Sequence, residues 1–222
     1  TGDRFTSVSA SFGNDLSTLP DFPAEIRAPA GTVNGVSSFQ VHISDHDITT
    51  PGDAPDVLVA MNPAALRSDL HRLKSNGSVI LNVDAFTERN LTKAGYDGDP
   101  RTDGTLDGFK VYEVPMTDLT KKSVEHLGVK PRDAERSKNF FALGLVSWMY
   151  TRPAKPTLDW IQQRFGKDQQ VADANTAAFK AGHAFGETAE LFDHAYEVKP
   201  AAKEPGTYTN ITGNTALAWG LI

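Results

Sequence analysis

Three polar side chains beside a glycine-containing loop are the first candidates for ligand chemistry in this sequence. Arg27 precedes the loop segment of residues 28–35, and Ser37 and Ser38 follow it. Glycine and asparagine inside the segment tolerate positive φ, which suits a shaped turn. A guanidinium and two hydroxyls beside such a turn can bind an anionic group. The alternative is a serine-capped hairpin with a solvated arginine, which is the commoner role of a loop arginine.

Two asparagines occupy positions at which ligands often bind. Asn62 follows the apolar run of residues 57–61 and precedes Pro63, a pattern typical of a helix N-cap. If the run is a parallel strand, Asn62 lies at the carboxyl edge of a sheet, where open α/β folds bind ligands. A ligand contact and a plain cap both remain open. Asn139 lies at the start of an apolar helix predicted over residues 137–150, and it could cap that helix, bind a ligand, or do both.

Other polar residues carry weaker signals. His42 and His46 are four residues apart, with Asp45 and Asp47 beside them. The spacing suits a metal only on a helix, whereas these residues run from a predicted strand into a turn, so the pattern argues against a metal site. Asn175 falls on the apolar face of a predicted helix, where we expect it to hydrogen-bond a neighbouring backbone group.

These side chains must be positioned by a fold in which strands and helices alternate. Residues 57–61 form a continuous apolar run, as expected of a parallel strand covered on both faces, and residues 78–83 are predicted to be a second buried strand. The segment between them has leucines at helical spacing, so the three pieces predict a right-handed βαβ unit. Residues 36–44 alternate apolar and polar side chains like a half-buried strand, and we expect them to return from an extended run over residues 22–27.

The predicted fold class is α/β: three layers, with a mostly parallel sheet, helices on both of its faces, and a β-hairpin-like extension. Gly144, inside the predicted buried helix, would allow another element to approach closely. The other predicted elements are a helix over residues 2–12, an insertion loop over 86–108, a strand over 109–115, and helices over 118–127, 157–165 and 168–192.

Composition excludes several classes of site. The chain has 222 residues and no cysteine, so it cannot supply a disulfide, an iron–sulfur cluster or a cysteine-bound zinc. A net charge of −6 without a basic block argues against non-specific nucleic-acid binding. The longest apolar run, residues 140–150, is too short to cross a bilayer, and no signal-peptide pattern opens the chain. We therefore expect a cytoplasmic location.

Five segments, in this order, together resemble the γ domain of the 2-oxoacid:ferredoxin (acceptor) oxidoreductases, joined to the start of the α subunit as in the 2-oxoglutarate type. The segments are FPAEIRAPAGTVNGVSSFQVHIS, DAPDVLVAMNPAALRSDLHRLKSNGSVILNVDAF, KNFFALG, ANTAAFKAG and ITGNTALAWGLI. Two departures stand out. The family's glycine-rich turn before the first helix is absent, and its Arg-Gly-Gly turn is Arg27-Ala28-Pro29-Ala30-Gly31 here.

The resemblance implies a division of the chain into three parts. Residues 1–196 correspond to the γ domain, 197–210 to a linker, and 211–222 to the beginning of the α subunit's pyrimidine-type domain. We expect both ends to continue in a longer polypeptide. A free-standing α/β ligand-binding or regulatory domain without a redox role is the alternative, and a hydrolase is disfavoured because no nucleophile–base signature is present.

The resemblance also implies a function within a complex. Such complexes decarboxylate a 2-oxoacid, here 2-oxoglutarate, on thiamine diphosphate, transfer the acyl group to coenzyme A, and pass electrons to ferredoxin. Thiamine diphosphate and the iron–sulfur clusters would reside in partner chains, with the β subunit as the main partner and a dimer possible. This chain would cover the active site and contact coenzyme A without supplying a catalytic group. The implied coenzyme A contacts are Arg27, Ser37, Ser38, Asn62 and Asn139.

Overall fold

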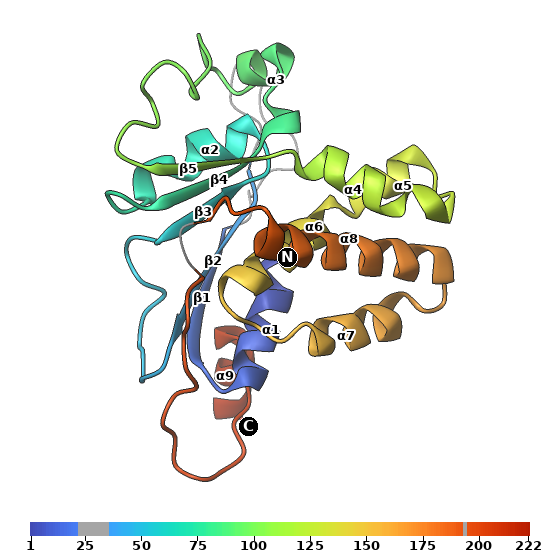
Figure 1. Ribbon diagram of the computed structural model, residues 1–222. Coiled ribbons are helices and arrows are strands. Elements are labelled where there is room, and N and C mark those ends of the chain that lie inside the picture. The colour runs from blue at the N-terminus through green and yellow to red at the C-terminus, as the bar shows by residue number, and fades with distance from the viewer. Residues whose placement is uncertain (22–35, 193–194) are drawn as a thin grey trace.

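The structure is a computed structural model that describes residues 1–21, 36–192 and 195–222 (Figure 1). The helices are α1 (Gly2–Phe12), α2 (Pro63–Asp69), α3 (Glu88–Lys93), α4 (Met116–Val124), α5 (Pro131–Arg136), α6 (Lys138–Met149), α7 (Lys155–Phe165), α8 (Gln169–Thr188) and α9 (Gly213–Gly220). The strands are β1 (Asp15–Asp21), β2 (Ser38–Ser44), β3 (Val57–Ala60), β4 (Ser78–Asn82) and β5 (Lys110–Val114). The short 3₁₀ turns of the described residues are η1 (Leu70–Arg72), η2 (Val83–Ala85) and η3 (Glu125–Leu127).

A parallel sheet of order β3-β4-β5 forms the centre of the molecule. The predicted βαβ unit is confirmed as β3, α2 and β4. All residues of β4 are buried, as expected of a central parallel strand, and its apolar residues Val79, Ile80 and Leu81 lie between the polar ends Ser78 and Asn82.

Alternate residues of β4 pack into separate cores on the two faces of the sheet. Val79 and Leu81 contact the cluster that includes α2 and α3, whereas Ile80 contacts the cluster built on α6. Figure 1 shows α2 and α3 on one face, and α4, α6 and α8 on the other. The predicted three-layer α/β architecture is therefore confirmed.

A β-hairpin extends this architecture. β1 and β2 pair antiparallel, with Asp15 opposite Ser44 and Asp21 opposite Ser38. The strand that pairs with β2 is thus β1, which was not predicted as a strand; the expected partner, residues 22–27, lies outside the described residues. β1 contains Pro20 and several polar residues, a composition tolerated because the two-stranded sheet leaves its outer edge unpaired.

Helices α6 and α8 cross with their backbones in contact. A Cβ on Gly144 would overlap the carbonyl oxygen of Phe179, and a Cβ on Gly182 would overlap that of Phe141. The close approach predicted for Gly144 is confirmed, and Gly182 is its counterpart on α8.

The structure differs from the predicted elements in three places. The expected insertion loop over residues 86–108 contains α3, because Thr87 caps a short helix through Asn90 N–H. α5, which begins at Pro131, was not predicted, since six residues are too few to show a periodic pattern. α8 ends at Thr188, short of residue 192.

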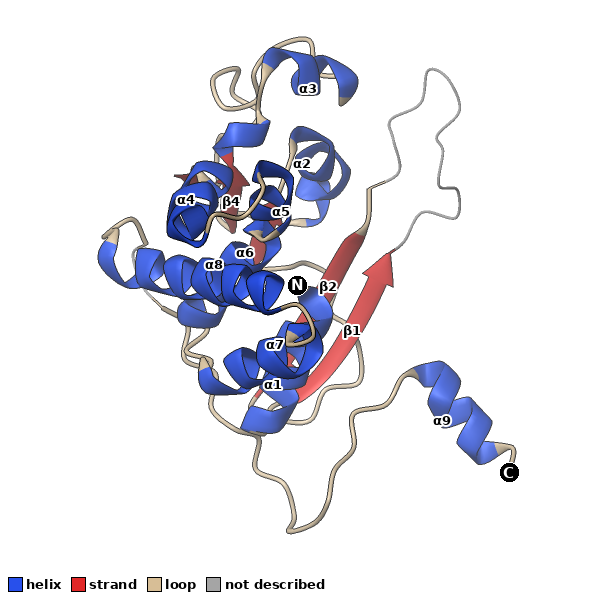
Figure 2. Cartoon of the chain, turned by 90° about the vertical axis from the view of Figure 1, so that its right-hand side faces the viewer, coloured by secondary structure: helices blue, strands red, loops and turns tan. Residues whose placement is uncertain are grey.

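The C-terminal part of the chain differs from the rest in its burial. No residue of α9 is buried, and Figure 2 shows this helix standing apart from the layered body. Leu217 and Trp219 on this helix, and Leu221 directly after it, are all exposed. Within the described residues, no helix has both the length and the apolar character needed to cross a membrane.

Candidate functional site

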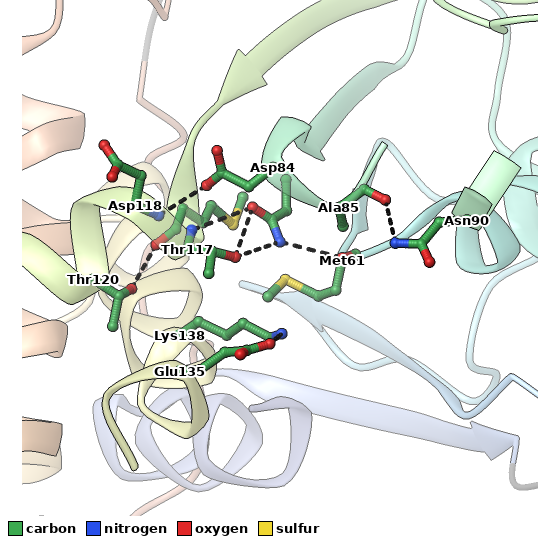
Figure 3. Close-up of polar contacts among 11 residues, drawn as sticks. Met61, Asp84, Ala85, Asn90, Thr117, Asp118, Thr120, Glu135 and Lys138 are labelled. Carbon is green, nitrogen blue, oxygen red and sulfur yellow. Dashed lines mark hydrogen bonds and ion pairs between the residues drawn. The ribbon is translucent and has the colours of Figure 1, made fainter. Parts of the chain in front are cut away.

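Polar side chains gather where the three parallel strands end. Asn62 follows β3, Asn82 closes β4, and Thr117 follows β5 in the first turn of α4. The carboxyl ends of parallel strands share one edge of a sheet, so these three residues belong to the same edge. Figure 3 shows Thr117 near Met61, the residue before Asn62.

Asn82 is the centre of this edge. Its side chain is fully buried and donates from Nδ2 to the carbonyl oxygen of Met61 (3.3 Å) and to Thr117 Oγ1 (3.1 Å). Its Oδ1 accepts from the backbone N–H of Thr117 at 3.3 Å. One amide therefore connects the end of β3, the end of β4 and the start of α4.

The start of α4 is occupied by side chains of the protein itself. Asp84 Oδ2 accepts from the backbone N–H of Asp118 at 2.8 Å, next to the bond that Asn82 makes with Thr117 (Figure 3). These N–H groups would otherwise be free to attract an anion. The beginning of α4 is thus closed to a phosphate by its own hydrogen bonds.

Asn62 caps α2, as predicted. Its Oδ1 accepts from Ala65 N–H at 2.9 Å, and Pro63 occupies the first position of the helix. The side chain is exposed, and its amide N–H groups have no hydrogen bond to any described residue. The cap therefore uses the oxygen and leaves the nitrogen available to a ligand.

Ser37 and Ser38 lie at the start of β2, as predicted, while Arg27 lies outside the described residues. Ser37 is exposed and Ser38 half-buried, and neither hydroxyl hydrogen-bonds another described side chain. The next residue, Phe39, packs against Gly2 at the start of α1. The two serines are therefore held near the N-terminal end of α1.

Asn139 reaches the same end of α1 from α6. Its carbonyl oxygen accepts from Thr1 Oγ1 at 3.2 Å, and a small cavity of about 50 Å³ lies beside it, lined also by Arg4 and Trp160. Asn139 does not cap α6, because the helix begins one residue earlier and Ser137 holds the N-cap position. Its own side chain is exposed.

The predicted residues thus form two groups in the described part of the chain. Ser37, Ser38 and Asn139 lie around the start of α1, whereas Asn62 belongs to the edge of the sheet. No hydrogen bond joins the two groups within that part. The cation drawn at the edge in Figure 3, Lys138, is paired with Glu135 at 3.2 Å.

A larger open hollow, of about 360 Å³, is lined by none of the predicted residues that the structure describes. Phe109, one of its lining residues, immediately precedes β5, so the hollow lies toward the amino ends of the strands. It is therefore separate from the carboxyl edge. Its lining consists of Arg67, Leu70, His71, Tyr96, Thr105 and Phe109.

The two histidines considered as metal ligands make local hydrogen bonds. His42 Nδ1 lies 2.9 Å from the carbonyl oxygen of Thr50, and His46 Nδ1 lies 2.7 Å from Ser44 Oγ. Among the described residues, no three acidic, histidine or cysteine side chains are grouped as a metal site would require.

Two further asparagines matter and were not predicted as site residues. Asn82 ends a buried apolar run just as Asn62 follows one, so the argument used for Asn62 could have found it. Asn14, which is buried and bonds to Arg152 at 2.5 Å, has no such signal, because its partner lies 138 residues away. Asn175 is buried as predicted, but its Oδ1 accepts from Ser137 Oγ (2.9 Å), a side chain instead of the expected backbone group.

Comparison with known proteins places these features in a family. Residues 1–185 match the family model described as pyruvate ferredoxin/flavodoxin oxidoreductase. Over all 222 residues the chain is 54% identical to the 2-oxoglutarate oxidoreductase subunit KorA of Mycobacterium tuberculosis. The match covers 34% of that relative, so the chain spans about a third of its length.

Solved structures show the same fold. The 2-oxoglutarate:ferredoxin oxidoreductase of Magnetococcus marinus, solved with 2-oxoglutarate, coenzyme A and succinyl-CoA bound, matches 90% of this chain and 30% of its own, with a TM-score of 0.65 and 24% identity. The γ subunit of a keto/oxoacid ferredoxin oxidoreductase from Geobacter sulfurreducens matches 84% of this chain and 89% of its own, with a TM-score of 0.54 and 15% identity. From the extent of the family match and of the identity, we conclude that the chain belongs to the pyruvate ferredoxin/flavodoxin oxidoreductase family.

Proposed function

We propose that this chain is the γ domain of a 2-oxoglutarate:ferredoxin oxidoreductase, where it covers the active site and helps to bind coenzyme A. The observation that supports this most is the 54% identity, across the whole chain, to a 2-oxoglutarate oxidoreductase subunit. The resemblance in fold to an oxidoreductase solved with coenzyme A agrees with it. The free-standing regulatory domain is less well supported, since that relative is a subunit of an oxidoreductase.

The reaction converts 2-oxoglutarate and coenzyme A to succinyl-CoA, carbon dioxide and a proton, and two electrons reduce two ferredoxins. Thiamine diphosphate, bound by the β subunit, supplies the stabilisation of charge that decarboxylation requires. These 222 residues contain no cysteine, so any iron–sulfur cluster of the complex would be held outside them. The role left to this chain is to bind and orient coenzyme A and to shield the active site.

The described residues offer neutral hydrogen-bond donors to coenzyme A. Among the described residues, no hydrogen bond occupies the donors of the Ser37 and Ser38 hydroxyls or of the Asn62 and Asn139 amides. The start of α4 is not a phosphate site, since Asn82 and Asp84 already bind its N–H groups. In this proposal the positive charge for a phosphate comes from Arg27.

The remaining parts of the chain fit the proposed division. Residues 1–196 form the γ domain, 197–210 connect it, and 211–222 begin the next domain of the subunit. The bare apolar side chains of α9 support this division, because a helix of that composition is normally covered. The β subunit and ferredoxin would be partners in the cytoplasm.

Substitution of Arg27 in the assembled enzyme tests the proposal. Arg27→Ala should raise the KM for coenzyme A roughly 10- to 100-fold, because a charged hydrogen bond contributes about 1.5–3 kcal/mol. The KM for 2-oxoglutarate should stay unchanged. Arg164→Ala, at an exposed position on α7, is the matched control. An unaltered dependence on coenzyme A would remove Arg27 from the site, and failure of the chain to associate with a β subunit would refute the domain assignment.

A further inference from the structure

The segment that follows α8 is bound to the body at several points before the chain reaches α9. We call residues 196–203 the strap. Its Tyr196 N–H donates to the carbonyl oxygen of Met149 (2.5 Å), and its Ala201 N–H donates to that of Gly13 (2.9 Å). Lys203 Nζ lies 2.8 Å from Asp15 Oδ1. The strap therefore bridges the end of α6 and the turn between α1 and β1.

Arg152 lies under the strap, and its burial is unusual. The residue is only 2% exposed, and its guanidinium carbon lies 4.3 Å from the centroid of the Phe12 ring. Nη1 donates to Asn14 Oδ1 (2.5 Å), and Nη2 donates to the carbonyl oxygen of Val198 (2.9 Å). Nε has no hydrogen-bond partner in the part of the chain that the structure describes. No carboxylate pairs with it among the described residues. A buried cation is costly unless its donors are satisfied, so the bond to Val198 matters.

Asn14 binds the neighbouring carbonyl of the strap. The residue is 3% exposed, and its Nδ2 donates to the carbonyl oxygen of Lys199 at 2.7 Å and to that of Ser44 at 3.3 Å. Because its Oδ1 accepts from Arg152, the two side chains form one unit. That unit holds two consecutive carbonyls of the strap, at positions 198 and 199.

The first residue of the strap is held separately. The ring of Tyr196 stacks on that of Tyr150 with centroids 5.0 Å apart, and Thr151 Oγ1 donates to the Tyr196 carbonyl oxygen at 2.6 Å. The strap thus begins at a fixed point on α6. Arg152 and Asn14 then determine where it runs.

We propose that Arg152 and Asn14 are a positioning pair that seats the strap, so that the chain leaves the body toward α9 along one fixed path. The dependence is mutual: the strap provides carbonyls that satisfy a buried guanidinium, and the guanidinium holds the strap in place. The seating itself does not depend on the proposed function. Seating the strap would also fix the position of the subunit's next domain relative to the γ domain, and this consequence does rest on the proposed function.

Hydrogen–deuterium exchange on the whole chain tests the seating. Asn14→Asp keeps an acceptor for Arg152 but loses the donor to the Lys199 carbonyl, so the body should stay folded while the strap is released. Arg152→Gln removes the donor to Val198. In both variants the amides of Tyr196 and Ala201 should exchange about tenfold faster or more, as expected for the loss of one or more hydrogen bonds. Arg164→Gln, exposed on α7, should leave exchange unchanged.

A distance measurement separates seating from general stability. Because the chain has no cysteine, spin labels can be placed through Ser11→Cys on α1 and Glu204→Cys just after the strap. The distribution of distances should be narrow in the parent chain and broad in the Asn14→Asp background. Unchanged strap exchange and unchanged distances in both variants would overturn the proposal. So would faster exchange in β4 equal to that in the strap, because the pair would then serve folding alone.

Discussion

Asn82 and Thr117 are joined by hydrogen bonds in both directions: Asn82 Nδ2 donates to Thr117 Oγ1 at 3.1 Å, and Thr117 N–H donates to Asn82 Oδ1 at 3.3 Å. The pair joins β4 to α4 at the edge of the sheet that also carries Asn62. Because Asn82 is fully buried, each of its partners would be left unsatisfied if it were removed.

Asn82→Ala should therefore lower the free energy of unfolding by about 1–3 kcal/mol. Urea denaturation monitored by tryptophan fluorescence measures the change. Asn139→Ala is the control: its side chain is exposed, so the free energy should move by less than about 0.5 kcal/mol. Equal effects of the two substitutions would contradict the role given to Asn82.

Asn62 offers a way to separate its cap from a ligand contact. Asn62→Ala should cost about 1 kcal/mol of stability, since Ala65 N–H loses its acceptor. Asn62→Asp retains the acceptor and should preserve stability. If Asn62 also contacts coenzyme A, Asn62→Asp should raise the KM for coenzyme A in the assembled enzyme, because a carboxylate cannot donate and repels phosphate. If Asn62→Asp has an unchanged KM for coenzyme A and unchanged stability, Asn62 serves only as a helix cap.

Gly144→Ala should be among the most destabilising single changes in the chain. The new methyl group would meet the backbone of α8, including His183 N at 2.9 Å, and a backbone cannot rotate away as a side chain can. We expect a loss of about 3 kcal/mol in thermal or urea unfolding. Gly220→Ala in α9 meets nothing within 4 Å and should leave the main unfolding transition unchanged. Similar unfolding midpoints for Gly144→Ala and Gly220→Ala would refute the close crossing of α6 and α8.

The contact between Asp15 and Lys203 should make stability depend on pH. The hydrogen bond from Lys203, together with one from Ile48 N–H at 2.8 Å, holds the pKa of the Asp15 carboxyl below its usual value. A lowered pKa contributes stability above the unfolded value, near 3.9, and this contribution is lost as pH falls through the folded pKa. Asp15→Asn should therefore cost about 1 kcal/mol near pH 7 and progressively less below about pH 4.

Urea unfolding of the parent chain and of Asp15→Asn, repeated from pH 7 down to pH 3, measures how the difference in their free energies of unfolding shrinks as the pH falls. Asp159→Asn provides the comparison, because its ion pair with Lys155 has both side chains more than half exposed. It should cost less than about 0.5 kcal/mol at every pH. A constant difference between parent and Asp15→Asn across the range would show that the carboxyl charge does not contribute.

The parts of the fold that were predictable depend on short stretches of sequence. The β3–α2–β4 unit was visible because buried parallel strands need continuous apolar runs and because Asn62-Pro63 marks a helix start. Gly144 was recognisable as a place of close approach because a glycine inside an apolar helix needs a packing reason. The alternation along β2 likewise identified the hairpin strand.

What could not be predicted depends on contacts between distant residues. β1 reads as a polar loop in sequence, and only its pairing with β2 makes it a strand. Arg152 and Asn14 are 138 residues apart, so nothing local connects them. Asn139 was correctly placed in the first turn of α6, but the helix begins at Lys138, so Ser137 and not Asn139 holds the N-cap position. A difference of this size is usual for helix ends. Arg27 lies outside the described residues, and its role stays a prediction.

The crossing of α6 and α8 has a mechanical consequence. Where backbone touches backbone, no flexible side chain is available to absorb sliding or rolling, so the two helices must shift together or not at all. α6 carries Asn139 at its exposed beginning, and α8 also packs along α4, whose first turn is tied to Asn82. A molecule that binds at Asn139 would therefore act on a stiff unit of three packed helices, α6, α8 and α4.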